Sequence, residues 1–76
     1  DDLIAYARSL LQGGRIRITP IRTGTTQAGI PNYSPGFIVN ANDTFGIILF
    51  QYSTGIIYSA SGSQSTTSGW KTFIPS

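Results

Sequence analysis

The chain has 76 residues, enough for one domain, and a domain of this size buries only about 60 % of the surface that its unfolded chain exposes. It has no Cys and no His, which excludes disulfide bonds and the usual zinc ligands, and we expect no cofactor. Charged residues make up 11 % of the sequence and the net charge is +2, which is too sparse for the dense basic stripe of a nucleic-acid-binding surface. Association with other chains is the remaining way to stabilise so small a core, although a compact monomer also fits these numbers.

The first twelve residues predict the one helix of the chain. Asp1 and Asp2 suit the positive end of a helix dipole, and Gly13 and Gly14 are typical of a helix stop. Between them, apolar side chains recur at helical spacing at Leu3, Ala7, Leu10 and Leu11. A helix this short is marginal in isolation, so it must pack on the chain's own sheet or on neighbouring copies. We therefore expect residues 1–14 to form a neck or packing helix and residues 15–76 to form a β-rich domain.

The segment after the helix alternates strictly between charged and apolar residues. This pattern predicts a half-buried strand over 15–19, with Ile16 and Ile18 facing inward and the arginines between them facing solvent. Pro20 ends the strand or places it at a sheet edge. A long polar connection follows over 23–36, and loops of this length in small domains are often functional.

The remaining chain predicts four further strands, over 36–41, 45–52, 56–60 and 70–74. Asn40, Asn42 and Asp43 predict a turn after the first of them. The segment 45–52 is almost wholly apolar, so we expect both its faces to be covered. Strands at such short intervals predict a mainly β fold: a small antiparallel sheet, sandwich or barrel with one short N-terminal helix.

The acidic residues are too few for most catalytic chemistry. Paired carboxylates need two suitably placed acids, and Asp1 and Asp2 are terminal, which leaves Asp43 alone. Without His there is also no base for a hydrolytic triad. We therefore expect a binding or structural protein and not an enzyme.

Aromatic and amide side chains are the candidates for a binding site. Aromatic rings stack on the C–H faces of sugars, while Asn and Asp bond to sugar hydroxyls. Tyr33 in the long connection and Asn40, Asn42 and Asp43 in the predicted turn are such candidates. Trp70 is a further one, for which packing in the core or at an interface is the competing interpretation.

Four segments in the second half of the chain carry a resemblance to a known family. They are Gly36-Phe37-Ile38, Gly46-Ile47-Ile48-Leu49, Ile57-Tyr58 and Gly69-Trp70-Lys71. Together with a closing Trp70-Lys71-Thr72-Phe73 they resemble the knob domains of phage and pyocin tail fibres, over about half the chain. The chain departs from that pattern where a Ser/Thr-rich loop replaces the Arg that often precedes the closing strand.

The resemblance implies a homotrimeric fibre tip, the C-terminal receptor-binding domain of a longer tail-fibre or baseplate protein of a virion. Its implied partner is a saccharide of the bacterial surface. A purely structural domain that trimerises and caps a fibre is the first alternative. A small nucleic-acid-binding barrel that uses Arg15, Arg17 and Arg22 with Tyr side chains is a more distant one. No apolar run approaches the length of a membrane span, so we expect no membrane insertion.

Overall fold

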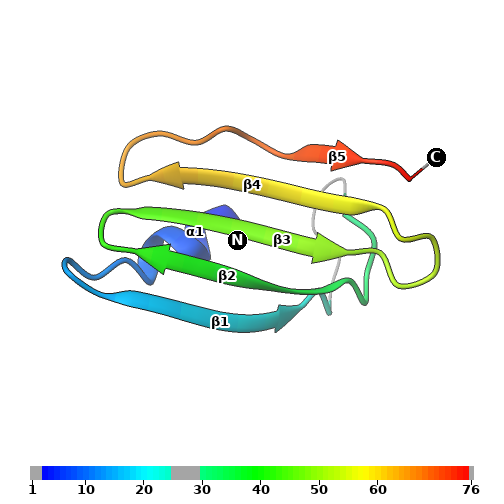
Figure 1. Ribbon diagram of the computed structural model, residues 1–76, viewed down its shortest axis with the longest axis horizontal. Helices are drawn as coiled ribbons and strands as arrows, with labels where there is room; N and C mark the ends of the chain where they lie inside the picture. Colours follow the sequence, from blue (N-terminus) through cyan, green and yellow to red (C-terminus); the bar gives the residue numbers. More distant parts are fainter. Residues whose placement is uncertain (1–2, 25–29, 76) are drawn as a thin grey trace.

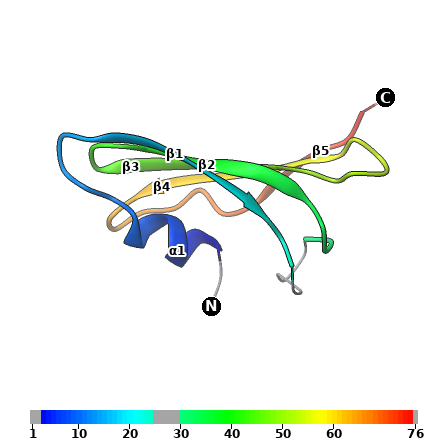
Figure 2. The same cartoon turned by 90° about the horizontal axis from the view of Figure 1, so that it is seen from below.

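The protein is a single open β-sheet with one short helix on one face (Figures 1 and 2). The computed structural model describes residues 3–24 and 30–75. Five antiparallel strands follow one another across the sheet in chain order, β1-β2-β3-β4-β5. The elements are α1 (Leu3–Ser9), β1 (Ile16–Arg22), β2 (Pro35–Ala41), β3 (Thr44–Phe50), β4 (Ile57–Ser63) and β5 (Lys71–Phe73). The mainly β, antiparallel prediction is confirmed, and the sheet is neither closed into a barrel nor paired into a sandwich.

Helix α1 is shorter than the sequence pattern predicts. It ends at Ser9, and single turn-type bonds from the N–H groups of Leu10 and Leu11 continue the chain beyond it. The predicted Asp1–Asp2 cap lies outside the described residues. Gly14 has φ 74°, a left-handed conformation that glycine adopts readily, so it serves the turn into β1 and not the helix end.

The hydrophobic core lies between α1 and the sheet. Its buried side chains come from one face of the three central strands, from the helix and from the β1–β2 connection: Ala7, Ile30, Ile38, Phe45, Ile47, Leu49 and Ala60. The helix packs on β3 and β4. Successive residues of a strand point to opposite faces, and among the described residues no helix or strand lies over the other face of these strands.

Two predictions about burial are wrong for this reason. The segment 45–52 was expected to be covered on both faces, but it is covered on one. Phe45, Ile47 and Leu49 are buried, whereas Phe50 is 38 % exposed. In β1, Ile16 and Ile18 were expected to face inward, yet their side chains are 82 % and 64 % exposed. Strand alternation defines two faces, and the position of α1 decides which of them becomes the core.

The β1–β2 connection is held together by its own polar groups where the structure describes it. Thr23 and Ser34 are buried, and their backbones pair through a bond from Thr23 N–H to the Ser34 carbonyl (3.1 Å). The Thr23 hydroxyl donates to the carbonyl of Pro31 (2.8 Å) and accepts from the Ser34 N–H (2.8 Å). The two ends of the connection are therefore fixed against each other, which sets the position of Tyr33 between them.

The polar segment predicted as a loop over 61–69 belongs partly to the sheet. Strand β4 continues to Ser63, and the chain then returns tightly with a bond between Ser63 and Thr66 and a bridge between Gly62 and Thr67. Arg8 of the helix secures this turn, since its Nε donates to the Ser63 carbonyl (2.9 Å). The helix is thereby tied to the far end of β4.

Candidate functional site

The sheet face turned away from α1 carries large apolar side chains that are exposed. Register places Ile16 beside Ala41, Ile18 beside Val39 and Phe37 beside Ile48, and these side chains point away from the core. We call this surface the open face. Its large apolar side chains are Ile16, Ile18, Phe37, Val39, Ile48, Phe50, Ile57 and Phe73.

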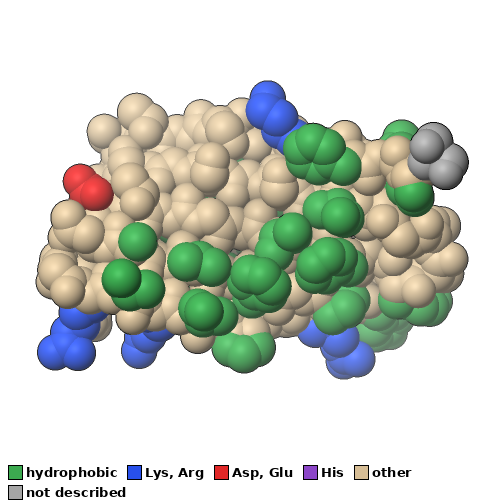
Figure 3. Space-filling model, in the orientation of Figure 1, with side chains coloured by type: hydrophobic (Ala, Val, Ile, Leu, Met, Phe, Trp, Pro, Cys, Tyr) green, Lys and Arg blue, Asp and Glu red, His purple; other side chains and the backbone are tan. Residues whose placement is uncertain are grey.

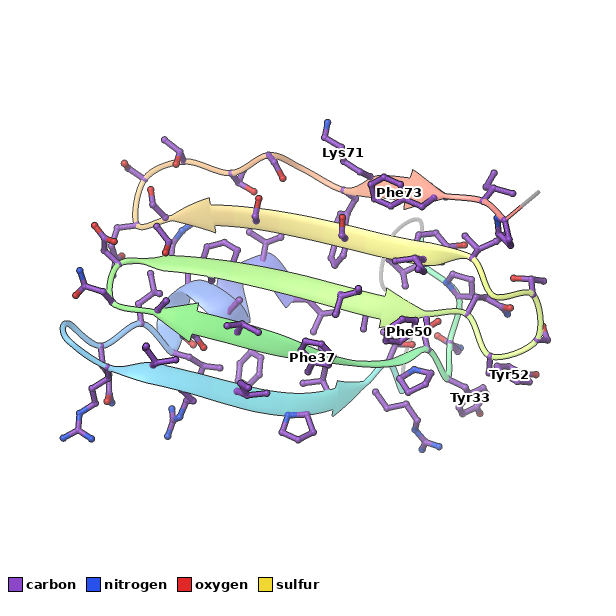
Figure 4. The ribbon with its side chains drawn as sticks, in the orientation of Figure 1. Tyr33, Phe37, Phe50, Tyr52, Lys71 and Phe73 are labelled. Carbon is purple, nitrogen blue, oxygen red and sulfur yellow. The ribbon has the colours of Figure 1, made fainter. Side chains whose placement is uncertain are left out.

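The apolar side chains of the open face are contiguous. Figure 3 shows hydrophobic side chains as a band that runs along the sheet over β1, β2 and β3. Phe50, Ile57 and Phe73 form one cross-strand row, because Phe50 pairs with Ile57 and Ile57 pairs with Phe73. Phe37 lies diagonally from Phe50 on the neighbouring strand, at a spacing of about 7–8 Å that aromatic side chains bridge (Figure 4).

A shallow groove of about 310 Å³ lies in the middle of the open face. Phe37, Val39 and Ile48 form its apolar side, and Ser59 and Ser61 form its polar side. Gly46 is its floor: a Cβ at this position would meet nothing within 4 Å. The groove exists because β3 has no side chain at this point of the open face.

The open face offers apolar contact area and little charge. Among the described residues, Lys71 at the β5 edge is the one charged residue in register with its central rows, where it pairs with Ser59. No group of three or more His, Cys, Asp or Glu side chains occurs within residues 3–24 and 30–75. The surface is therefore suited to bury apolar area against another surface.

The predicted site residues are not brought together. Tyr33 precedes β2 and Asn42 and Asp43 follow it, so the seven residues of this strand separate them by about 20 Å. Tyr33 is 54 % exposed with φ 64°, and the guanidinium carbon of Arg22 lies 5.4 Å from its ring centroid. At the other end of the strand, Asp43 is exposed in the two-residue turn between β2 and β3. Any ligand of these residues would contact one end of the sheet or the other.

Asn42 and Trp70 have structural roles. The Asn42 side-chain carbonyl accepts a bond from the Gly14 N–H (2.7 Å), and its backbone N–H donates to the carbonyl of Arg15 (2.8 Å). Trp70 is half-buried and packs against the core, as the competing interpretation of this residue predicts. Both side chains therefore stabilise the fold.

Asn40 does not belong to the predicted turn. It lies within β2 on the helix side, is 2 % exposed, and donates through Nδ2 to the Ala7 carbonyl (3.0 Å). The Asn-Ala-Asn-Asp segment was read as a single turn, whereas the turn occupies Asn42 and Asp43 alone. Asn40 is consequently a buried polar residue of the core.

The open face is what sequence reasoning missed. The available signal was that β1, β2 and β3 carry apolar residues at both odd and even positions, as in Phe37-Ile38-Val39 and Ile47-Ile48-Leu49-Phe50. Such a pattern indicates two apolar faces. The sequence was interpreted as though the chain itself covered both of them.

Comparison with known proteins adds no relationship to this geometry: no protein-family model, no curated protein and no solved structure matches the chain. Within the described part of the chain, no helix has the length and apolar character needed to cross a membrane.

Proposed function

We propose that this chain is a self-associating attachment domain of a phage-type tail fibre or baseplate protein, which forms a homotrimer through its open face and contacts a saccharide of the host surface. The observation that carries the proposal is the exposed apolar band of the open face, with Ile16 at 82 % and Ile18 at 64 % exposure. The class of fibre comes from the resemblance of the segments between Gly36 and Phe73 to tail-fibre knob domains.

The size of the open face supports other copies of the chain as its occupants. The molecule measures 37 × 23 Å in the plane of the sheet, which gives a projected face on the order of 850 Å². A specific protein interface buries about 800 Å² per partner. The apolar band covers part of this face (Figure 3), and contiguous exposed apolar patches are typical of protein-interaction surfaces.

The composition of the β1 edge favours association through the faces of the sheet over pairing of β1 with a strand of another chain. The outer strand β1 contains Pro20, which has no N–H to donate, and Arg17 and Arg22 flank it. Prolines and charged side chains at a sheet edge oppose pairing with another strand. Three copies can instead pack their open faces around a common three-fold axis, where the surface is apolar and nearly free of charge.

The attachment part of the proposal uses surfaces that such an assembly leaves free. Tyr33 with its neighbouring Arg22, and the turn at Asn42 and Asp43, lie at the two ends of the sheet and not in the central rows of the open face. Both remain accessible to a saccharide. The low charge of the chain also suits a neutral ligand better than a polyanion.

Substitution on the open face tests the association. Ile18→Lys places a charge where the side chain is exposed, so an isolated chain tolerates it, while an apolar interface does not. Thr72→Lys is the matched control, since Thr72 is exposed and pairs with Tyr58 on the opposite face. We expect light scattering to show a monomer for Ile18→Lys and a trimer for Thr72→Lys. Equal masses for the two variants would contradict the proposed interface.

The purely structural alternative differs from attachment in that it involves no glycan binding. It is favoured by the same open face, which accounts for assembly without any ligand. A glycan array probed with the intact chain, and with a Tyr33→Ala, Asp43→Ala variant of unchanged mass, distinguishes the two. Binding that the variant loses supports attachment, whereas an array without signal leaves assembly as the function.

A further inference from the structure

The groove above Gly46 is a hole in the open face at the position of one missing side chain. Gly46 lies between the buried Phe45 and Ile47, so a side chain at this position would point to the open face. The half-buried Val39 and Ile48 form part of the apolar wall of the groove. An apolar side chain from outside that entered the groove would remove these walls from water, which is favourable.

The same level of the sheet that carries this hole also carries an exposed apolar side chain. Ile18 pairs with Val39, and Val39 pairs with Gly46, so the three residues form one row across β1, β2 and β3. Ile18 is 64 % exposed at the β1 end of the row. Ile16 begins the next row, about 7 Å further along the strands, and there β3 carries Thr44 in place of a glycine.

A three-fold axis parallel to the strands would keep such rows level in all three copies. The strands run along the 37 Å length of the molecule, so this axis lets each open face point inward over its whole length (Figure 1). A rotation moves nothing along its own axis, and each residue therefore stays at the same height in every copy. Interfaces around a three-fold axis are heterologous, so the β1 side of one face meets a different part of the next face.

We propose that the Ile18 side chain of each copy packs into the Gly46 groove of the next copy, around a three-fold axis parallel to the strands. This inference rests on the proposed homotrimer and names the contact that holds it together. Ile18 supplies a branched apolar side chain, and the groove of about 310 Å³ supplies apolar walls with an open floor. Ile16 is more exposed than Ile18, but its level of the sheet offers no such hole.

Engineered cysteines test the contact, because the chain has no Cys of its own. The test variant is Ile18→Cys with Gly46→Cys, and the matched control is Ile16→Cys with Gly46→Cys. Within one chain, the Cα atoms of residues 18 and 46 lie two strand spacings apart, at about 9–10 Å, and those of residues 16 and 46 lie further apart. A disulfide spans at most about 7 Å between Cα atoms, so any disulfide in either variant joins two chains. After mild oxidation, we expect covalent trimers of the test variant on a non-reducing gel and mainly single chains of the control.

The other outcomes separate this contact from the homotrimer itself. Covalent dimers as the end product would indicate two-fold pairing and overturn the three-fold arrangement. Equal cross-linking of the two variants would overturn the match in level between Ile18 and Gly46. If neither variant forms a disulfide while the unmodified chain sediments as a trimer, the Ile18–Gly46 contact is overturned and the homotrimer stands. If the unmodified chain is a monomer, the homotrimer fails and this contact fails with it.

A double-mutant cycle gives a second test that needs no disulfide. Gly46→Val fills the groove, and the isolated chain should tolerate it because a Cβ at Gly46 meets nothing within 4 Å and valine suits a strand. We expect Gly46→Val to weaken association at least tenfold in the unmodified background. In an Ile18→Ala background, which leaves less side chain to exclude, we expect the same change to weaken association less than threefold. Equal losses in the two backgrounds, measured by sedimentation, would overturn the direct contact.

Discussion

Ile18 lies directly opposite Val39 in the β1–β2 ladder, on the side of the sheet that no element of the described chain covers. Ile18 is 64 % exposed although it belongs to an alternating strand whose apolar residues would be expected to face the core. The core instead lies behind β2, where Ile38 is completely buried. This arrangement leaves an exposed apolar surface, which we propose is covered by other copies of the chain.

The core and the open face should respond differently to truncation. Leu49 is fully buried in the core, whereas the adjacent Phe50 is 38 % exposed on the open face. We expect Leu49→Ala to lower the free energy of unfolding by about 2–5 kcal/mol at any protein concentration. We expect Phe50→Ala to cost less at high dilution and more as concentration rises, because association contributes to its stability. Urea denaturation over a concentration series measures both, and a concentration-independent loss for Phe50→Ala would argue against a role in association.

Two glycines of neighbouring strands should give opposite results. A Cβ at Gly36 would overlap the carbonyl group of Ile48, whereas a Cβ at Gly46 would meet nothing within 4 Å. We expect Gly36→Ala to destabilise the protein by about 1–3 kcal/mol through overpacking. Gly46→Ala should instead stabilise it by about 0.4–1 kcal/mol, because it restricts the unfolded chain. Thermal unfolding at high dilution compares them, and a destabilised Gly46→Ala would show that the floor of the groove is more crowded than described.

The β2–β3 turn depends on Asn42 for two separate reasons. Its φ is 59°, a left-handed conformation, and its side chain accepts the bond from the Gly14 N–H. Asn42→Ala should lose both advantages, at about 1–2 kcal/mol for the backbone and about 1 kcal/mol for the bond. Asn42→Gly relieves the backbone and should recover most of the first cost. Chemical denaturation of the pair separates the two contributions; if Ala and Gly are equally destabilising, the left-handed conformation contributes nothing.

The sequence predicted much of the fold and little of its surfaces. Strand positions followed from Gly, Pro and Asn punctuation, and consecutive pairing followed from short turns such as Asn42-Asp43. Which side of each strand is buried did not follow, because alternation is symmetric until a helix covers one face. The inward assignment of Ile18 failed on this point.

The candidate site was predictable only residue by residue. Tyr33 and Asp43 are predicted as binding candidates from their places in a long connection and a turn, and both side chains are exposed. Their separation follows from the strand predicted over 36–41 between them, which the structure contains as β2. The burial of Asn40 could not be predicted, because its partner, the Ala7 carbonyl, lies 33 residues away in the sequence.

The mass of the unmodified chain in solution tests self-association most directly. Sedimentation equilibrium from low to high micromolar concentration should give three times the chain mass of 8.1 kDa, with dissociation only at the lowest concentrations. A constant mass of 8.1 kDa throughout that range would contradict the proposal that copies of this chain cover the open face.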